Sequence, residues 1–167
     1  HGPKGLRRIA NRVASLTHCF AEAAKKNGFT LNNSHFDTLV IETGSNTDQI
    51  MQAGADNLMN FYRASDSQIS ISFSETTETK DIVELASCFG FSISLDEVES
   101  FTGGAGFNNT LLRQDDILTH PVFNTHHSET ELMRYMHQLE VKDIALNQSM
   151  IALGSCTMKL NAASEML

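Results

Sequence analysis

The chain has 167 residues, 41% of them hydrophobic, which is enough for one ordinary domain with a core. No stretch approaches the roughly 20 consecutive apolar residues that a membrane-spanning helix requires, so we expect no membrane segment. The formal net charge is −8; residues 1–26 hold six basic residues and one acid, which leaves −13 on the remainder. An acidic remainder, and a basic segment without interleaved aromatic residues, argue against nucleic-acid binding.

The first half of the sequence predicts alternating helices and strands. An apolar stripe at helical spacing predicts an amphipathic helix over residues 4–26, whose basic residues we interpret as its solvated face, with the helix packing on a partner domain. The stripe consists of Leu6, Ile9, Val13, Leu16, Phe20 and Ala24. The elements predicted after it are a strand at 36–42, a helix at 47–55, strands at 57–63 and 68–74, and a helix at 79–90 that Thr79 can cap.

This order of elements, helix–β–α–β–β–α, predicts an α+β subdomain. We expect a three-stranded sheet with helices on one side, and its open face or edge requires cover from another element.

The second half of the sequence changes character. Residues 91 to about 120 contain Gly103, Gly104 and Gly106 without a long hydrophobic period, which predicts a linker or extended arm. Ser128 followed by Glu131 predicts a capping box that opens a helix, and a second short segment follows around "KDIALN".

Four histidines, His120, His126, His127 and His137, fall within eighteen residues and could suggest a metal site. Zinc sites normally show closely spaced ligand pairs such as H-E-x-x-H, which are absent here, and adjacent side chains such as His126 and His127 diverge. We therefore expect no metal site, and interpret these as loop histidines that form hydrogen bonds or meet an anion.

A polar turn, "GSCTMKLN", follows at residues 154–161. Cys156 could be a nucleophile if a base or cation lowered its pKa, but a turn whose amides and hydroxyls line a pocket explains the same residues. Lys159 has no phosphate-binding glycine run beside it, so it is not expected to anchor a cofactor. Cys19, Cys88 and Cys156 are odd in number and far apart, which argues against a disulfide framework and fits a reducing compartment.

Residues 118–166 closely resemble the P-protein family of the glycine cleavage system, the pyridoxal-phosphate-dependent glycine decarboxylases. The resemblance rests on "HPVFN", "HSETELMRYMH", "ALNQ" and "GSCTMKLN", and it extends less distinctively through "HGPKGLRRIA", "FDTLVIE" and "FSETTE". One departure is Ala152, where the family usually has proline.

The resemblance implies a fragment of a polypeptide several times longer, built from two halves that each resemble a fold-type I aminotransferase. Residues 1–106 would be the small C-terminal domain of the first half with its entry helix. Residues 107–167 would be the connecting arm and the N-terminal segment of the second half. The family's anchoring lysine lies in a His-Lys motif beyond residue 167, so the fragment is expected to bind no pyridoxal phosphate and to be inactive alone.

The resemblance also implies the activity of the intact enzyme. It decarboxylates glycine with pyridoxal phosphate as the electron acceptor and passes the aminomethyl group to the lipoyl arm of the H-protein. Ser155, Cys156 and Thr157 would form a wall of the substrate and cofactor cavity, with His120, His127, Gly154 and Lys159 as weaker candidates. The parent would be a dimer, in the cytoplasm of a bacterium or the mitochondrial matrix of a eukaryote. The alternatives are an amino-acid-sensing module and a non-catalytic interaction scaffold.

Overall fold

The computed structural model describes residues 1–102, 109–142 and 148 of the chain. They belong to two units, residues 1–118 and residues 119–167. The first unit contains the sheet and four of the α-helices, and the second contains the helix that follows Ser128.

Helix α1 spans Gly2–Lys26, close to the predicted range, and Pro3 lies in its first turn. Val13, Leu16, Phe20 and Ala24 are buried on one face, as the stripe predicts. For the first two residues of the stripe the prediction was wrong, because the core cluster begins at Val13: Leu6 is exposed and Ile9 is only partly buried. Gly28 follows the helix with φ +89°, a left-handed conformation that favours glycine.

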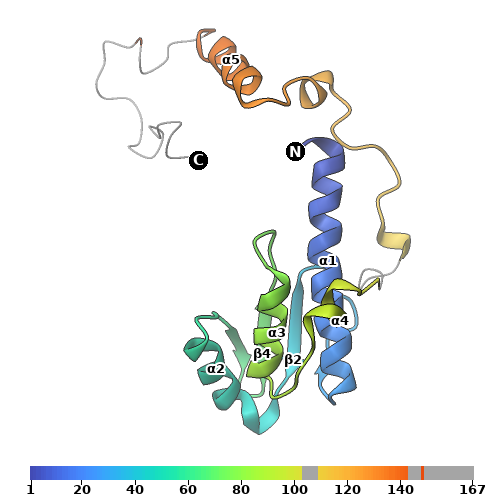
Figure 1. The fold of residues 1–167 in the computed structure, drawn as a ribbon, viewed down its shortest axis with the longest axis vertical. Coiled ribbons are helices and arrows are strands. Elements are labelled where there is room, and N and C mark those ends of the chain that lie inside the picture. The colour runs from blue at the N-terminus through green and yellow to red at the C-terminus, as the bar shows by residue number, and fades with distance from the viewer. Residues whose placement is uncertain (103–108, 143–147, 149–167) are drawn as a thin grey trace. The chain divides into compact units, whose positions relative to one another are not determined.

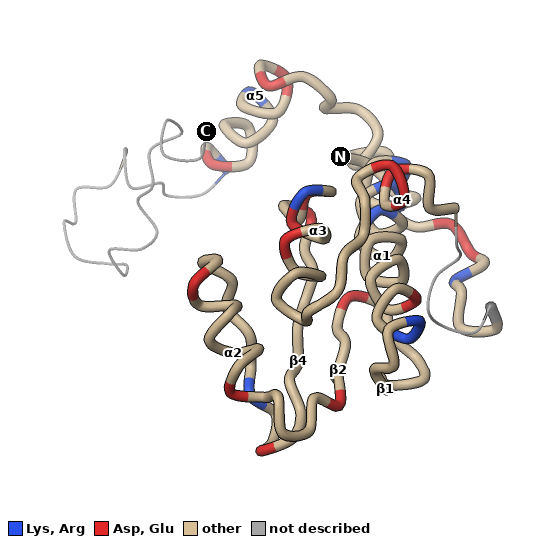
Figure 2. Tube along the Cα trace, turned by 60° about the horizontal axis from the view of Figure 1, so that its bottom comes forward, with Lys and Arg blue, Asp and Glu red and all other residues tan. Residues whose placement is uncertain are grey.

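The basic residues of α1 lie on its exposed side, which confirms the expected solvated face (Figure 2). Arg7 donates a hydrogen bond to the Asp115 carbonyl at 3.3 Å and lies 3.9 Å from the Asp116 carboxylate, and Arg12 donates to the Glu75 carbonyl at 3.3 Å. Acidic residues are spread over the other helices of the unit (Figure 2).

The sheet has four antiparallel strands in the order β1-β2-β4-β3: β1 Thr30–Leu31, β2 Thr38–Glu42, β3 Tyr62–Ser65 and β4 Gln68–Ser72. The prediction of three strands was wrong because β1 has only two residues, too few to show an alternating pattern. It is held by pairing with β2, where Thr30 lies opposite Glu42 and Leu31 opposite Ile41.

Helices cover one face of this sheet, as predicted. Leu39 and Ile41 of β2 and Ile69 and Ile71 of β4 are buried, whereas the residues between them are partly or fully exposed. Figure 1 shows α3 lying across β2 and β4 with α1 beside it. Helix α2 spans Thr47–Asp56 after the short 3₁₀ turn η1 Gly44–Asn46, α3 spans Thr79–Cys88, and α4 spans Leu95–Glu99.

Three elements differ in position from the sequence prediction. Strand β3 spans Tyr62–Ser65 rather than the predicted 57–63, because residues 57–61 form the connection from α2. Glu78, rather than Thr79, caps α3, and it forms a reciprocal capping box with Asp81. Helix α4 lies within the stretch predicted as a linker, because five residues are too few to establish a helical period. Ser94 and Glu97 form a second capping box at its start.

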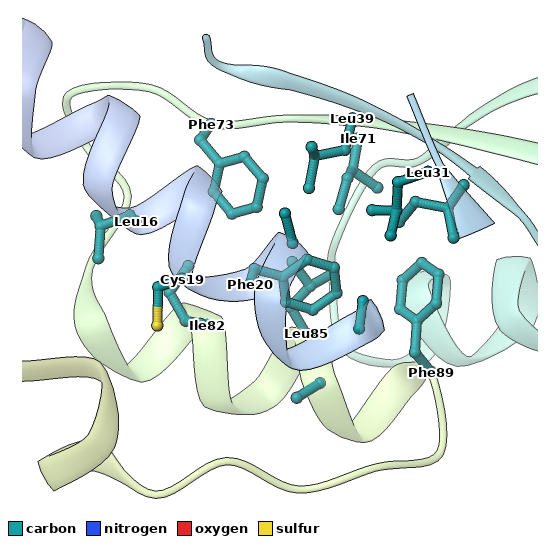
Figure 3. Packing of buried hydrophobic residues seen from close by; sticks show 14 of the residues in the cluster. Leu16, Cys19, Phe20, Leu31, Leu39, Ile71, Phe73, Ile82, Leu85 and Phe89 are labelled. Carbon is teal, nitrogen blue, oxygen red and sulfur yellow. The ribbon is translucent and has the colours of Figure 1, made fainter. Parts of the chain in front are cut away.

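The core of the first unit is built around Phe20 of α1 (Figure 3). Its ring meets the ring of Phe89 edge-on at a centroid distance of 5.6 Å and lies 6.1 Å from that of Phe73. Burying a phenylalanine side chain contributes about 2–3 kcal/mol, so this residue is a major contributor to the stability of the unit. Ile82 and Leu85 of α3 complete the contact between the helices and the sheet.

The second unit begins with the 3₁₀ turn η3, Pro121–Asn124, and continues into α5, Glu129–Glu140. The Ser128 hydroxyl accepts a hydrogen bond from the Glu131 N–H at 3.2 Å, so the serine half of the predicted capping box is present. The segment predicted around "KDIALN" lies almost wholly outside the described residues. Within the described ranges, no helix has the length and apolar character needed to cross a membrane.

Candidate functional site

The polar turn predicted as a cavity wall lies outside the described residues. Gly154, Ser155, Cys156, Thr157 and Lys159 all belong to that part of the chain. Their assignment to a cavity therefore stays a prediction.

His120 has a local structural role in the second unit. It is the N-cap of η3, where its Nδ1 accepts a hydrogen bond from the Val122 N–H at 3.2 Å, and its ring lies edge-on to Phe123. His127 is exposed and immediately precedes Ser128, the N-cap of α5. The structure thus places both candidates in the turn that leads into α5.

The other two histidines of the cluster also have local partners. The His126 ring stacks on Tyr135 with centroids 4.3 Å apart, and His137 Nδ1 lies 3.0 Å from Glu140 Oε2. Over residues 1–102, 109–142 and 148, no three His, Cys, Asp or Glu side chains are arranged to hold a metal ion.

The two described cysteines, Cys19 and Cys88, are free and buried. Burial raises the pKa of both thiols, and the nearby Glu97 carboxylate raises that of Cys19 further. A thiol with a raised pKa is a poor nucleophile at neutral pH, so these cysteines contribute to packing rather than catalysis.

A pair of histidines in the first unit, His35 buried and His18 partly buried, was missed by the sequence analysis. His18 Nδ1 of α1 and His35 Nε2, in the loop before β2, lie 3.3 Å apart. His35 is only 5% exposed, and its Nδ1 has no hydrogen-bond partner among the described residues. Burial lowers the pKa of His35, and His18 and Lys25 act in the same direction. No local pattern signals this pair, because its members lie on different elements.

The described residues do not form a pyridoxal phosphate site. A lysine that anchors such a cofactor is normally desolvated, whereas every lysine in the described part of the chain is exposed. These lysines are Lys4, Lys25, Lys26, Lys80 and Lys142. No step of a pyridoxal-dependent reaction is therefore assigned to described side chains.

The first unit has an open hollow of about 540 Å³ beside the end of β4. One wall is the connection from α2 to β3, residues 57–61; a second is residues 71–74; and a third is α3. Met59, Phe61 and Ile82 supply apolar surface, and Asp81 and Glu84 supply carboxylates.

Together these features define an acidic α+β domain with one covered sheet face and, in its described residues, no cofactor anchor of its own. The family model of the glycine cleavage system P-protein matches residues 1–89, just over half of the chain. The chain belongs to the glycine cleavage system P-protein family.

Curated relatives extend the similarity over the whole chain. Glycine dehydrogenase (decarboxylating) of Cupriavidus metallidurans is 46% identical over 170 residues, and that of Paraburkholderia xenovorans is 46% identical over 177 residues. The protein of the same name from Paraburkholderia phytofirmans is 44% identical over 177 residues. Each alignment covers 100% of this chain but only 18% of the relative, so the chain spans about a fifth of their length.

Proposed function

We propose that this chain supplies one part of a pyridoxal-phosphate-dependent glycine decarboxylase, the P-protein of the glycine cleavage system. The observation that carries the proposal is 44–46% identity along the whole chain to proteins named glycine dehydrogenase (decarboxylating). The complete enzyme would release carbon dioxide from glycine and transfer the aminomethyl group to the lipoyl arm of the H-protein.

The α+β unit would be the small domain of a fold-type I half. In support of this assignment, the described residues provide a packed core and an antiparallel sheet covered on one face, but no desolvated lysine. In this proposal the chain shapes and closes a site that other parts of the enzyme complete, and by itself it has no decarboxylase activity.

The polar turn would contribute donors to that site. The hydroxyls of Ser155 and Thr157 and the backbone amides around Cys156 are suited to hold the glycine carboxylate or a polar edge of the cofactor. Donors that are fixed before the reaction stabilise developing charge without the cost of reorganising solvent. His120 and His127 would lie nearer the entrance of the same cavity.

A chimera tests this proposal. The chain replaces the aligned 18% of the Cupriavidus metallidurans protein, and carbon dioxide release from glycine is measured with pyridoxal phosphate and lipoylated H-protein. We expect the chimera to be active and the isolated chain to be inactive under the same conditions. An inactive but folded chimera, or a decarboxylase activity of the chain alone, would contradict the proposal.

Substitutions in the chimera test the polar turn. We expect Thr157→Ala and Cys156→Ser to lower kcat/KM for glycine by about tenfold or more, as for the loss of a preorganised donor. Thr130→Ala in exposed α5 is the matched control and should leave the activity unchanged. Unaltered glycine affinity and turnover in both variants of the turn would exclude its residues from the site.

The amino-acid-sensing alternative has its own test. Thermal unfolding of the chain is followed with glycine and with other amino acids, and no stabilisation is expected. A saturable rise in Tm with one amino acid would favour a sensor over a part of the decarboxylase.

A further inference from the structure

The open edge of β4 lies next to the hollow beside α3. Strand β3 pairs with β4 only as far as Ser70, which lies opposite Tyr62. Strand β4 continues to Ser72, where β2 is its only neighbouring strand in the described part of the chain, through the pair Thr38 and Ser72. The last residues of β4 therefore have a partner strand on one side only.

The hydrogen-bonding pattern shows which backbone groups this leaves open. The Phe73 N–H donates to the Asp37 carbonyl at 2.9 Å, so residue 73 directs its backbone groups toward β2. In an antiparallel sheet the direction alternates, and Ser72 therefore directs its N–H and C=O toward the side of β3. Among the described residues, no strand pairs with β4 on this side beyond Ser70, and Ser72 is exposed. Such an edge can accept an added strand.

The wall opposite this edge presents an apolar side chain in a strained position. Leu58 is 93% exposed and has φ +58°. It occupies the position after the α2 C-cap, where the Met59 N–H returns to the Gly54 carbonyl at 2.8 Å, and where glycine is usual. Because both the backbone conformation and the exposure of Leu58 are unfavourable in the free chain, its side chain is a candidate for contact with a ligand.

The charge of the hollow selects the kind of ligand. Its charged lining side chains are Asp81 and Glu84 of α3, and no lysine or arginine of the described residues lines it. One oxygen of Asp81 accepts the Glu78 N–H in the capping box, and Glu84 is exposed. An extended segment lying along β4 would therefore gain from a lysine or arginine directed toward α3.

We propose that this edge groove, formed by residues 57–61, residues 71–74 and α3, binds an extended peptide segment with a basic side chain. The segment lies beside Ser72 as an additional strand of the sheet and exchanges backbone hydrogen bonds with that residue. It contacts Leu58 and directs its basic side chain to the carboxylates of α3. This docking site is independent of the proposed decarboxylase activity.

The test uses the full chain and a synthetic peptide. The probe is the blocked hexapeptide Thr-Val-Lys-Val-Lys-Thr, added to the ¹⁵N-labelled chain up to about 5 mM, which detects even millimolar affinity. We expect saturable amide shifts confined to residues 57–61, residues 70–74 and the start of α3. A control peptide has the same sequence but carries N-methyl groups on alternate backbone nitrogens, those that point to one edge of the strand. It should bind several-fold more weakly, because it cannot donate backbone hydrogen bonds from that edge.

Two variants separate the contributions to binding. Glu84→Lys should weaken binding by about fivefold, and Glu99→Lys, the same charge change on α4, should leave it unchanged. Leu58→Gly relieves the strained backbone and should weaken binding without loss of folding.

Each of these results would overturn the proposal: no shifts at the highest peptide concentration, equal binding of the N-methylated peptide, or equal effects of Glu84→Lys and Glu99→Lys. Concentration-dependent shifts of the same amides without peptide would assign the edge to a second copy of the chain, and would also overturn it.

Discussion

Gly54 sets the distance between α2 and the entry to β3. A methyl carbon at this position would lie 2.6 Å from Cδ2 of Phe61, too close for any real contact. Gly54→Ala gains about 1 kcal/mol of helix propensity, but the clash costs about 1–3 kcal/mol. We therefore expect a net loss of up to about 2 kcal/mol in the free energy of unfolding, measured by urea denaturation.

At Leu58, which follows the end of the same helix, we expect the introduction of a glycine to be stabilising. Since its φ of +58° suits glycine, Leu58→Gly should raise the free energy of unfolding by about 1 kcal/mol. Leu58→Ala keeps the unfavourable conformation and removes only exposed atoms, so it should be nearly neutral. Equal stability changes in the two variants would show that backbone strain at residue 58 is not the cause.

Single residues also show where prediction from sequence stops. The stripe from Leu6 to Ala24 predicted a buried face from its regular helical spacing, and the structure buries the part from Val13 onward. His18 and His35 could not be paired in this way, since their contact joins a helix to a loop and depends on the tertiary fold. The predicted cap Thr79 was one residue late because Glu78 also forms a capping box, with Asp81 as its partner.

The His18–His35 contact joins α1 to the loop before β2 and makes the stability of this junction dependent on pH. Burial, His18 and Lys25 lower the pKa of His35 below its ordinary 6.5, while the Asn32 carbonyl and Glu22 act weakly against them. As the pH falls, His35 therefore becomes protonated at a higher pH in the unfolded chain than in the folded chain. Its contribution to stability is complete above pH 6.5 and is lost as the pH falls through the lower, folded pKa.

We expect the free energy of unfolding to fall as the pH drops below 6.5 toward the lower, folded pKa of His35, by less than about 1.4 kcal/mol per pH unit for this one group. Urea denaturation at a series of pH values measures the slope. His35→Leu, which removes the buried titrating group, should flatten the profile in this window. An unchanged slope in the variant would assign the pH dependence to other groups.

Helix α4 depends on its capping box. The Ser94 hydroxyl accepts from the Glu97 N–H at 3.2 Å, and Glu97 Oε2 accepts from the Ser94 N–H at 2.8 Å. We expect Ser94→Ala to cost about 1 kcal/mol and to speed hydrogen exchange at Val98 and Ser100. Ser92→Ala, an exposed serine just outside the helix, is the control. Slow exchange that persists in Ser94→Ala would show that the core contact of Val98 alone holds α4.

Length decided which elements could be predicted. Helices α1, α2, α3 and α5 and strands β2 and β4 show enough of their period to be found. Strand β1 and helix α4 have two and five residues, and each forms because the rest of the unit supplies pairing partners or a buried surface. The start of β3 was misplaced because the residues that close α2, Asn57 to Met59, are as apolar as a strand.

Among the described residues, the hydrophobic core lies in the first unit. Its buried hydrophobic residues run from Val13 to Val98, and the described residues of the second unit contribute none. We therefore expect a chain ending at Leu118 to unfold cooperatively with a Tm close to that of the full chain, measured by circular dichroism. A Tm lower by more than about 5 °C, near 1 kcal/mol for a unit of this size, would show that residues 119–167 stabilise it.

The candidate site could be predicted only in part from the sequence. The motifs at 118–161 led from the sequence to the family, and the family match at residues 1–89 confirmed it. The proposed cavity would need side chains from more than one part of a longer polypeptide, and spacing along these 167 residues does not give their geometry. The edge groove could not be predicted from the sequence, because it depends on β3 beginning opposite Ser70 while β4 continues to Ser72.

The strand order β1-β2-β4-β3 also has a consequence for how the chain folds. Strands β3 and β4 form a hairpin across Asp66 and Ser67, and their pairing closes a short loop. The central pairing of β2 with β4 joins Glu42 to Gln68 and Thr38 to Ser72, residues separated by 26 and 34 positions. Closing that larger loop costs more conformational entropy before its contacts stabilise it, so we expect the hairpin to form early. The joining of β2 to β4, with α1 docked on their buried face, is then the step that limits the folding rate.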